Sequence, residues 1–292
     1  MQIQALLREA TAALAAVGVD TPQLDAQVLL MNVLEVPRSY LYTWPEKSLT
    51  AAQLEHFQQL LEQRLSGVPV AYLTGFREFW SMAFAVSEST LIPRPDTEIL
   101  VETALALLPN EPARVLELGT GTGAIAIALA SERPHWQVTA VDVVPAAVAL
   151  ASKNAERLLH EAQRSQFQVM LSDWFSAVEN KPRFQLIVSN PPYLASNDPH
   201  LEQGDVRFEP RSALVAEHDG LADYERIIAQ SGDYLCADGW LLFEHGCEQG
   251  AALRQRLADA GFSQIQTWRD YAGLERVTGG QKTLQKRPIK QR

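Results

Sequence analysis

Apolar residues recur at helical spacing through the first part of the chain and in short continuous runs through the remainder. Over residues 3–17 this spacing predicts an amphipathic helix. Thr21-Pro22 supplies a cap and a first-turn proline for a second helix, and Thr50 with Gln53 forms a capping box ahead of another. The pattern therefore predicts a small helical N-terminal domain over residues 1–75.

The pattern changes after this helical part. Short aromatic-rich segments predict a β-hairpin, which we place in a linker over residues 76–91. Beyond it, continuous apolar runs alternate with helical segments, as expected for a parallel sheet covered by helices on both faces. We therefore expect an α/β domain over residues 92–281, followed by a short basic tail over 282–292. The predicted strands are 115–118, 138–141, 167–171, 184–188, 240–243 and 265–268.

Composition and charge narrow the class of protein. The chain has 292 residues, of which 47% are hydrophobic, enough for one large α/β domain and a smaller partner domain. Its formal net charge of -10 argues against binding duplex DNA by neutralising phosphates, because that mode needs clustered Lys and Arg. No direct nucleic-acid partner is expected.

The two cysteines and the hydropathy pattern indicate the cellular compartment of the protein. Cys236 and Cys247 lack metal-ligand spacing, so we expect no metal site, two buried thiols and a reducing compartment. No apolar run approaches the roughly 20 residues needed to span a bilayer. The sequence therefore predicts a cytoplasmic protein with no membrane partner.

Three alternating glycines lie between the strand predicted at 115–118 and the helix after it. In Gly119-Thr120-Gly121-Thr122-Gly123 the missing side chains allow the backbone to approach a nucleotide-like ligand. Asp142 ends the next strand about 20 residues on, where a carboxylate can accept both hydroxyl hydrogens of a ribose. Asp173 and Trp174 follow the third strand, where they can bind an adenine amino group and cover its ring. An adenosine-bearing ligand is predicted.

Two alternatives stay open for this turn. Its glycines can simply allow a helix to pack closely on a strand, and an NAD enzyme would show nearly the same pattern. Glu117 lies just before the first glycine and favours S-adenosylmethionine over NAD. A carboxylate there can bind the ammonium of the donor's amino-acid group, which a dinucleotide lacks.

The strand predicted at 184–188 runs into a rigid polar loop, Asn190-Pro191-Pro192-Tyr193. Ligands bind at the carboxyl ends of parallel strands, so we expect this loop and the glycine turn to share one crevice. The Asn190 side-chain oxygen and the Pro191 carbonyl can each accept one N–H of a planar amide or amino group. The prolines fix these acceptors, and Tyr193 can lie against the flat group. A turn that only ends the strand is the alternative.

The two motifs resemble the signatures of amino-methyltransferases, which act on adenine or on glutamine amides. Further stretches narrow the resemblance to the HemK/PrmC family, the peptide chain release factor glutamine N5-methyltransferases. The similarity begins in the helical domain and runs to about Thr278. The stretches are Tyr72-Leu73-Thr74-Gly75, Arg77-Glu78-Phe79-Trp80, residues 91–98, Val206-Arg207-Phe208-Glu209-Pro210 and Glu244-His245-Gly246.

This resemblance implies a fold and a reaction. The fold is a Rossmann-like class I methyltransferase sheet of seven mostly parallel strands, preceded by a helical domain that helps to grip the substrate protein. The donor is S-adenosyl-L-methionine and the product S-adenosyl-L-homocysteine. The acceptor is the glutamine of the Gly-Gly-Gln motif of class I release factors, whose methylation supports translation termination.

The resemblance also implies roles for residues. Asn190, Pro191 and Tyr193 are expected to be catalytic, and together with Pro192 they would bind the glutamine. Five further residues are left open between shaping the pocket and forming structural ion pairs or caps: Arg94, Asp96, Glu98, Glu209 and His245. Cofactor contacts are expected from Glu117, Gly119, Thr120, Gly121, Thr122, Gly123, Asp142, Asp173, Trp174 and Asn190.

Three other functions are each disfavoured by a feature of the sequence. A DNA adenine methyltransferase uses a similar loop on a flipped base, but the acidic balance of this chain disfavours it. A glutamine methyltransferase acting on a ribosomal protein fits the N-terminal segments less well. A translation-factor-binding protein without turnover is disfavoured by the intact Asn190 loop.

One feature departs from the family pattern. Gly279-Gly280-Gln281 repeats the substrate tripeptide near the end of the chain. It is either a chance ending of the last strand or a tail that enters the crevice as a pseudo-substrate.

Overall fold

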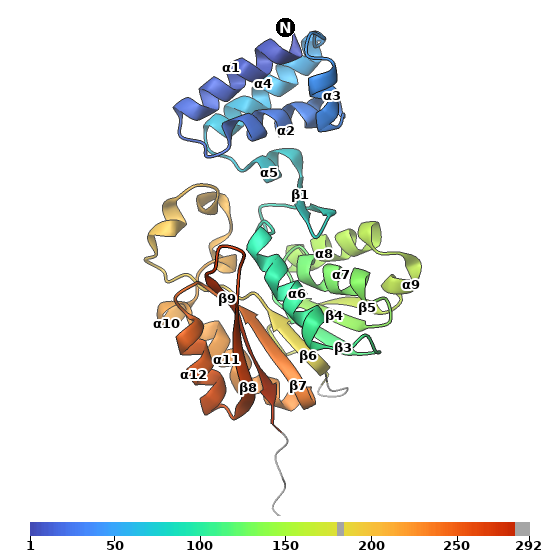
Figure 1. The fold of residues 1–292 in the computed structure, drawn as a ribbon, viewed down its shortest axis with the longest axis vertical. Coiled ribbons are helices and arrows are strands. Elements are labelled where there is room, and N and C mark those ends of the chain that lie inside the picture. Colours follow the sequence, from blue (N-terminus) through green and yellow to red (C-terminus); the bar gives the residue numbers. More distant parts are fainter. Residues whose placement is uncertain (180–183, 284–292) are drawn as a thin grey trace, which may run out of the picture. The chain divides into compact units, whose positions relative to one another are not determined.

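The computed structural model describes residues 1–179 and 184–283 (Figure 1). By their mutual contacts these residues form two compact units. The first combines Met1–Phe76 with Glu202–Phe208, and the second contains Arg77–Leu201 and the chain from Glu209 onward. Most of the predicted basic tail, 284–292, lies outside the described residues. Within the described part of the chain, no helix is long and apolar enough to cross a membrane.

The first unit is built from helices around one apolar core. Leu14, Leu29, Leu30 and Phe57 are each 0% exposed within this core. The predicted capping box is present, because the Thr50 side chain accepts from the Gln53 N–H and the Gln53 side chain accepts from the Thr50 N–H. The helices are α1 (Ile3–Ala16), α2 (Pro22–Leu34), α3 (Arg38–Thr43), α4 (Ala51–Leu65) and α5 (Val70–Thr74).

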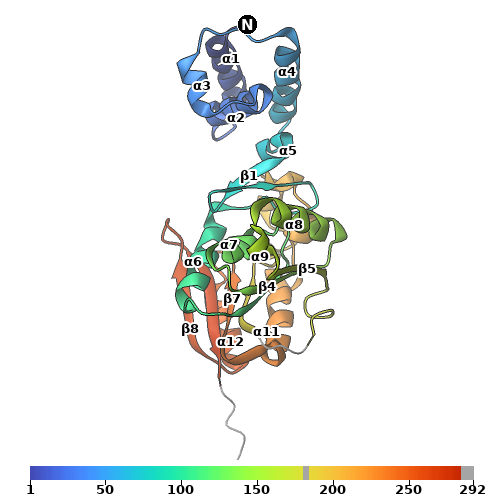
Figure 2. The same ribbon diagram turned by 90° about the vertical axis from the view of Figure 1, so that its right-hand side faces the viewer.

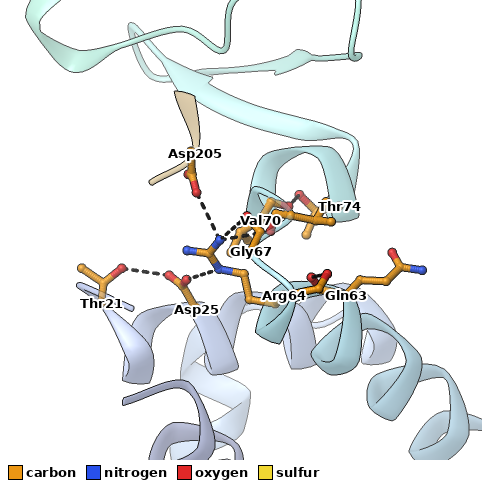
Figure 3. A network of polar contacts seen from close by, with 10 residues as sticks. Thr21, Asp25, Gln63, Arg64, Gly67, Val70, Thr74 and Asp205 are labelled. Atoms are coloured by element: carbon orange, nitrogen blue, oxygen red, sulfur yellow. Dashed lines mark hydrogen bonds and ion pairs between the residues drawn. The ribbon is translucent and has the colours of Figure 1, made fainter. Parts of the chain in front are cut away.

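A short segment from much later in the chain belongs to this helical unit. Glu202–Phe208 groups with α1 to α5, although the residues on both sides of it belong to the second unit. Arg64 at the end of α4 binds the segment, with Nη1 lying 3.1 Å from Oδ1 of Asp205 (Figure 3). The same guanidinium also donates to the carbonyl oxygens of Gly67 and Val68.

A hairpin of β1 (Phe76–Phe79) and β2 (Met82–Ala85) occupies the position predicted for one. Asn154 joins it to the glycine turn, because its side chain exchanges two hydrogen bonds with the backbone of Ala85 and donates a third to the Thr122 carbonyl. The buried side-chain amide of Asn154 therefore helps to fix the hairpin against the glycine turn.

Seven strands form one mostly parallel sheet, in the order β5-β4-β3-β6-β7-β9-β8. The first five strands in this order run parallel, whereas β9 pairs antiparallel with both of its neighbours. The predicted seven-stranded, mostly parallel fold is confirmed. The strands are β3 (Arg114–Leu118), β4 (Gln137–Asp142), β5 (Phe167–Leu171), β6 (Phe184–Ser189), β7 (Leu235–Glu244), β8 (Phe262–Arg269) and β9 (Glu275–Lys282).

Helices cover both faces of the sheet (Figures 1 and 2). Successive strand residues alternate between the two cores, so Val115 packs with α6, α7 and α8 while Leu116 packs with α11 and α12. This explains why the strands read as continuous apolar runs. The helices are α6 (Glu98–Leu107), α7 (Ala124–Glu132), α8 (Pro145–Leu158), α11 (Ala222–Tyr234) and α12 (Gly250–Asp259), with shorter η1 (Pro95–Thr97), α9 (Glu161–Arg164), η2 (Pro199–Glu202), η3 (Val206–Phe208), η4 (Arg211–Ala213) and α10 (Glu217–Gly220).

The expectation of two buried thiols is wrong. Cys236 is only half-buried near the start of β7, and Cys247 is exposed. Cys247 lies in the turn between β7 and α12, where the chain has left the sheet and no longer packs on either core.

Candidate active site

The glycine turn connects β3 to α7 and is fixed to the neighbouring strand. The N–H groups of Gly119 and Thr120 both donate to the carbonyl oxygen of Val141 at 2.9 Å. Gly123 has a φ of 83°, and a Cβ there would lie 2.9 Å from the Cδ1 of Ile127 and 3.2 Å from the Cβ of Ala151. Only glycine fits at this helix start, so close packing explains Gly123 without any ligand.

Glu117 lies next to this turn as a buried acid, 1% exposed. Its Oε2 accepts from the Thr120 hydroxyl at 2.5 Å and from the Ala126 N–H at 3.1 Å. Burial raises the pKa of Glu117 to about 8, although these two hydrogen bonds lower it and the Asp142 charge adds a smaller rise. A carboxylate placed so far from water is suited to a cationic ligand group.

Asp142 at the end of β4 is held by backbone donors on both oxygens. Its Oδ2 accepts from the Gly121 N–H at 2.8 Å, and its Oδ1 accepts from the Val144 N–H at 2.9 Å. Each carboxylate oxygen can accept more than one hydrogen bond, so the group retains acceptor capacity toward the pocket that it lines.

Asp173 and Trp174 follow β5, and both line the same pocket. Asp173 forms an ion pair with Arg226 of α11. Arg226 was not among the site residues predicted from the sequence. Trp174 adopts a φ of 48°, and a Cβ on Gly119 would contact its ring at 3.5 Å. The indole therefore lies directly against the glycine turn.

These residues line one cavity of about 300 Å³ at the carboxyl ends of the parallel strands. Three predicted site residues, Gly123, Pro191 and Tyr193, are not among those that line it. The predicted residues that do are Glu117, Gly119, Thr120, Gly121, Thr122, Asp142, Asp173, Trp174, Asn190 and Pro192. Lining residues that sequence reasoning did not assign to a site include Thr90, Leu91, Pro93, Thr97, Val143, Ser212, Asp223 and Arg226.

The sheet order places the lining groups in sequence along one edge. The ends of β5, β4, β3 and β6 are neighbours in that order, because β3 pairs with both β4 and β6. They carry Trp174, Asp142, Glu117 and Asn190, respectively. These four side chains fit an adenosyl group with a cationic amino-acid end. An indole, a carboxylate suited to a ribose and a buried acid follow one another along the edge, and the Asn190 loop comes last.

The acceptor loop is held by backbone and side-chain contacts. The Tyr193 N–H donates to the Leu214 carbonyl at 3.2 Å, and its carbonyl accepts from Gln249 Nε2 at 3.0 Å. Burial is the main cause that raises the pKa of the Tyr193 phenol above its usual range, so the hydroxyl stays protonated. Asn190 Nδ2 lies 3.4 Å from the hydroxyl oxygen of Thr97. The loop is thus a fixed part of the fold.

The five residues left open from the sequence divide between structural contacts and the pocket. Glu98 accepts from the Trp80 N–H, and Glu209 accepts from the Ile92 N–H and pairs with Arg94, so both acids brace the 92–98 segment. Of the five, only Arg94 also lines the cavity. Asp96 pairs with Arg276 at 3.3 Å.

His245 is a buried structural histidine. Its ring nitrogens contact the Gly246 carbonyl and the Thr278 hydroxyl, each at 2.8 Å. Burial lowers its pKa, so the ring is neutral at pH 7. It ties the end of β7 to β9.

The sheet, the glycine turn and the Asn190 loop define a class I methyltransferase. Two family models match the chain: the PrmC N-terminal domain over residues 5–75 and the methyltransferase small domain over residues 95–205. The release factor glutamine methyltransferase of Vibrio cholerae serotype O1 is 54% identical over 280 residues, covering 96% of each chain. That of Escherichia coli strain K12 is 51% identical, covering 96% of this chain and 99% of the other. The chain belongs to the release factor glutamine methyltransferase family.

A solved structure supports the fold independently. The crystal structure of a methyltransferase from Pyrococcus furiosus matches with a TM-score of 0.52 at 16% identity. The match covers 78% of this chain and 98% of that one. Similarity at this level of identity bears on the fold alone.

Proposed function

We propose that this chain transfers a methyl group from S-adenosyl-L-methionine to the side-chain amide nitrogen, N5, of the glutamine in the Gly-Gly-Gln motif of class I peptide chain release factors. The proposal rests on membership of the release factor glutamine methyltransferase family together with one geometric observation. Asn190 lines the same cavity as Glu117, Asp142 and Trp174, so an amide acceptor and the donor-binding groups share one space.

The chain's own residues would hold the donor by distinct chemistry. Glu117 would bind the cationic amino-acid end, Asp142 would accept from ribose hydroxyls, and Trp174 would cover the adenine with Asp173 at its amino group. When bound, S-adenosylmethionine supplies a methyl group made electrophilic by its sulfonium sulfur.

A glutamine amide is a poor nucleophile because its nitrogen lone pair is delocalised into the carbonyl. Asn190 Oδ1 and the Pro191 carbonyl would each accept one of its N–H bonds, while Pro192 and Tyr193 fix the loop that carries them. The nitrogen is thereby aimed at the methyl carbon. The new N–C bond forms as the C–S bond breaks, and the methylated amide then loses its extra proton to solvent. Such placement can contribute about 7 to 11 kcal/mol toward lowering the barrier.

The test is to incubate the enzyme with isotopically labelled donor and a purified release factor, and then to map the label by peptide mass spectrometry. We expect one methyl on the glutamine of Gly-Gly-Gln, and none on a release factor in which that glutamine is replaced by glutamate. Label on another residue, or on a nucleic acid added in parallel, would refute the proposed acceptor.

A further inference from the structure

Glu244 is a buried carboxylate that the proposed reaction leaves without a role. It ends β7 beside the end of β6, where Phe243 is in register with Ser189, the residue before Asn190. Its side chain is almost fully buried, and its Oε2 has no hydrogen-bond partner among the described residues. Glu244 does not line the cavity itself.

Two neighbours connect Glu244 to that cavity. Thr97 and Asn190 both lie within reach of the Glu244 carboxylate as hydrogen-bond donors that lower its pKa, and both also line the cavity. Asn190 Nδ2 in addition lies 3.4 Å from the Thr97 hydroxyl oxygen. Glu244 therefore lies beside two polar side chains that line the cavity, although it does not line the cavity itself.

The chemistry of a carboxylate decides which end of the Asn190 amide faces it. An ionised carboxylate only accepts hydrogen bonds, so it selects the NH₂ end and repels the carbonyl end. The Oδ1 of Asn190 is then left for another donor. A protonated Glu244 could itself donate, and this selection between the two ends would weaken.

We propose that Glu244 is a positioning residue, whose ionised carboxylate holds the NH₂ end of Asn190 together with Thr97 and so keeps Oδ1 available to the substrate amide. This rests on the proposed function for its effect on turnover. The orientation itself is a property of the free enzyme.

The groups around Glu244 make the orientation of the Asn190 amide sensitive to pH. Burial is the largest cause that raises its pKa to about 7, and the bonds from Thr97 and Asn190 lower it. Arg276 from β9 also lowers the pKa, while Asp96 from η1 raises it. Two tyrosines also face it, Tyr193 and Tyr224, and burial raises the pKa of both phenols so that both stay protonated. The ionised fraction of Glu244 therefore increases through neutral pH.

The kinetic test compares Glu244→Gln with the wild type. We expect kcat at pH 8 to fall roughly tenfold to a hundredfold, with the donor Kd changed by less than about twofold. The wild-type kcat should rise through a step near pH 7, and Glu244→Gln should lose that step. Thr97→Ser should retain more kcat than Thr97→Val. Glu275→Gln, the same change at an acid outside the network, should keep wild-type kcat.

A purely structural role for Glu244 predicts that Glu244→Gln is less stable than the wild type. The positioning role predicts the opposite: removing a buried charge while keeping its shape should leave the midpoint of thermal unfolding at pH 8 equal or higher. A Glu244→Gln variant that loses turnover only because it melts earlier would overturn the inference. Wild-type kcat and an unchanged pH profile in that variant would do so as well.

A readout without substrate separates this inference from the proposed function. The side-chain NH₂ resonances of Asn190, assigned by their loss in Asn190→Ala, should shift with a midpoint near pH 7 in the donor-free wild type. They should be flat in Glu244→Gln. A flat wild-type titration overturns the inference even if the enzyme is active. A clear titration without methylation of a release factor leaves the inference standing and refutes the function.

Discussion

Arg64 and Asp205 are 141 residues apart in the chain, yet a guanidinium nitrogen and a carboxylate oxygen lie 3.1 Å apart (Figure 3). The same guanidinium donates through Nε to Asp25 at 2.8 Å. The two acids differ in exposure, since the Asp25 side chain is 9% exposed and that of Asp205 is 39% exposed. This difference decides what each contributes to stability.

Asp25 should contribute far more than Asp205 to the stability of the helical unit. Replacing Arg64 by Met leaves a buried Asp25 without its cationic partner and with the Thr21 hydroxyl as a donor, which should destabilise the helical unit by about 3 kcal/mol. Asp205→Asn removes a more exposed partner, so the loss should stay below about 1 kcal/mol. Hydrogen exchange of α2 and α4 measures both effects locally. Equal losses in the two variants would contradict this assignment.

Asn190→Ala should lower turnover much more than donor binding. One hydrogen bond to the reacting amide contributes on the order of 1 to 3 kcal/mol, which is roughly tenfold to a hundredfold in kcat. Calorimetry should find the donor Kd nearly unchanged. Asp142→Asn is the matched comparison, because it should weaken donor binding more than it slows bound enzyme. Collapse of donor affinity in Asn190→Ala would instead assign Asn190 to the cofactor site.

Glu117 should couple donor binding to proton release. With a pKa raised by burial to about 8, this carboxyl is mostly protonated in the free enzyme at pH 7. A donor ammonium beside it favours the ionised form, so binding should expel roughly one proton. Calorimetry in buffers of different ionisation enthalpy measures this release, which should vanish in Glu117→Gln. Binding without proton release by the wild type would remove Glu117 from the ammonium site.

The same raised pKa fixes how stability depends on pH. The folded state holds the Glu117 proton more tightly than the unfolded chain does. Its contribution is therefore complete below the ordinary pKa of 4.5 and is lost as pH rises through about 8. The slope should not exceed about 1.4 kcal/mol per pH unit for this one group. Hydrogen exchange of β3 at pH 5 and pH 8 should show the loss in the wild type and a smaller one in Glu117→Gln.

The sequence predicted those features of the fold and the cavity that follow from a local pattern of residues. The continuous apolar runs predicted the parallel strands, in which Val115 and Leu116 face two different cores. The glycine turn with Asp142 and Trp174 predicted part of the lining of the cavity. Arg226 was missed because it reaches the cavity from α11, a helix whose position depends on tertiary packing.

Other features depended on contacts that no local pattern encodes. Glu202–Phe208 groups with the helical unit and contains Asp205, which pairs with Arg64 far away in sequence. The strand β9 was not among the predicted strands, because Gly279 and Gly280 have poor strand propensity. The close approach of β7 requires a small residue at Gly279, and Phe262 and Ile265 of β8 crowd Gly280, which only the folded sheet reveals.

Gly279, Gly280 and Gln281 lie within β9, which favours the strand-ending interpretation of the repeated tripeptide. A Cβ on Gly279 would lie 2.7 Å from the Leu241 carbonyl oxygen and would also overlap the Leu242 side chain. Gly279→Ala should therefore destabilise the sheet by about 1 to 3 kcal/mol. Gly273→Ala, where no atom lies near the added Cβ, tests the cost of positive φ alone.

Gln281 itself should not be a substrate. It pairs with Trp240 of β7, whereas the end of β7 nearest Asn190 pairs with Val277. Its Nε2 donates to the Asp238 carbonyl at 2.8 Å, and its Oε1 accepts from Gln264 at 2.9 Å, so the amide is occupied. Mass spectrometry after incubation with donor alone should find Gln281 unmodified, and Gln281→Ala should leave kcat and KM for the release factor unchanged. A methyl group on Gln281 would require this part of β9 to leave the sheet, and with it the pairing that now explains the two glycines.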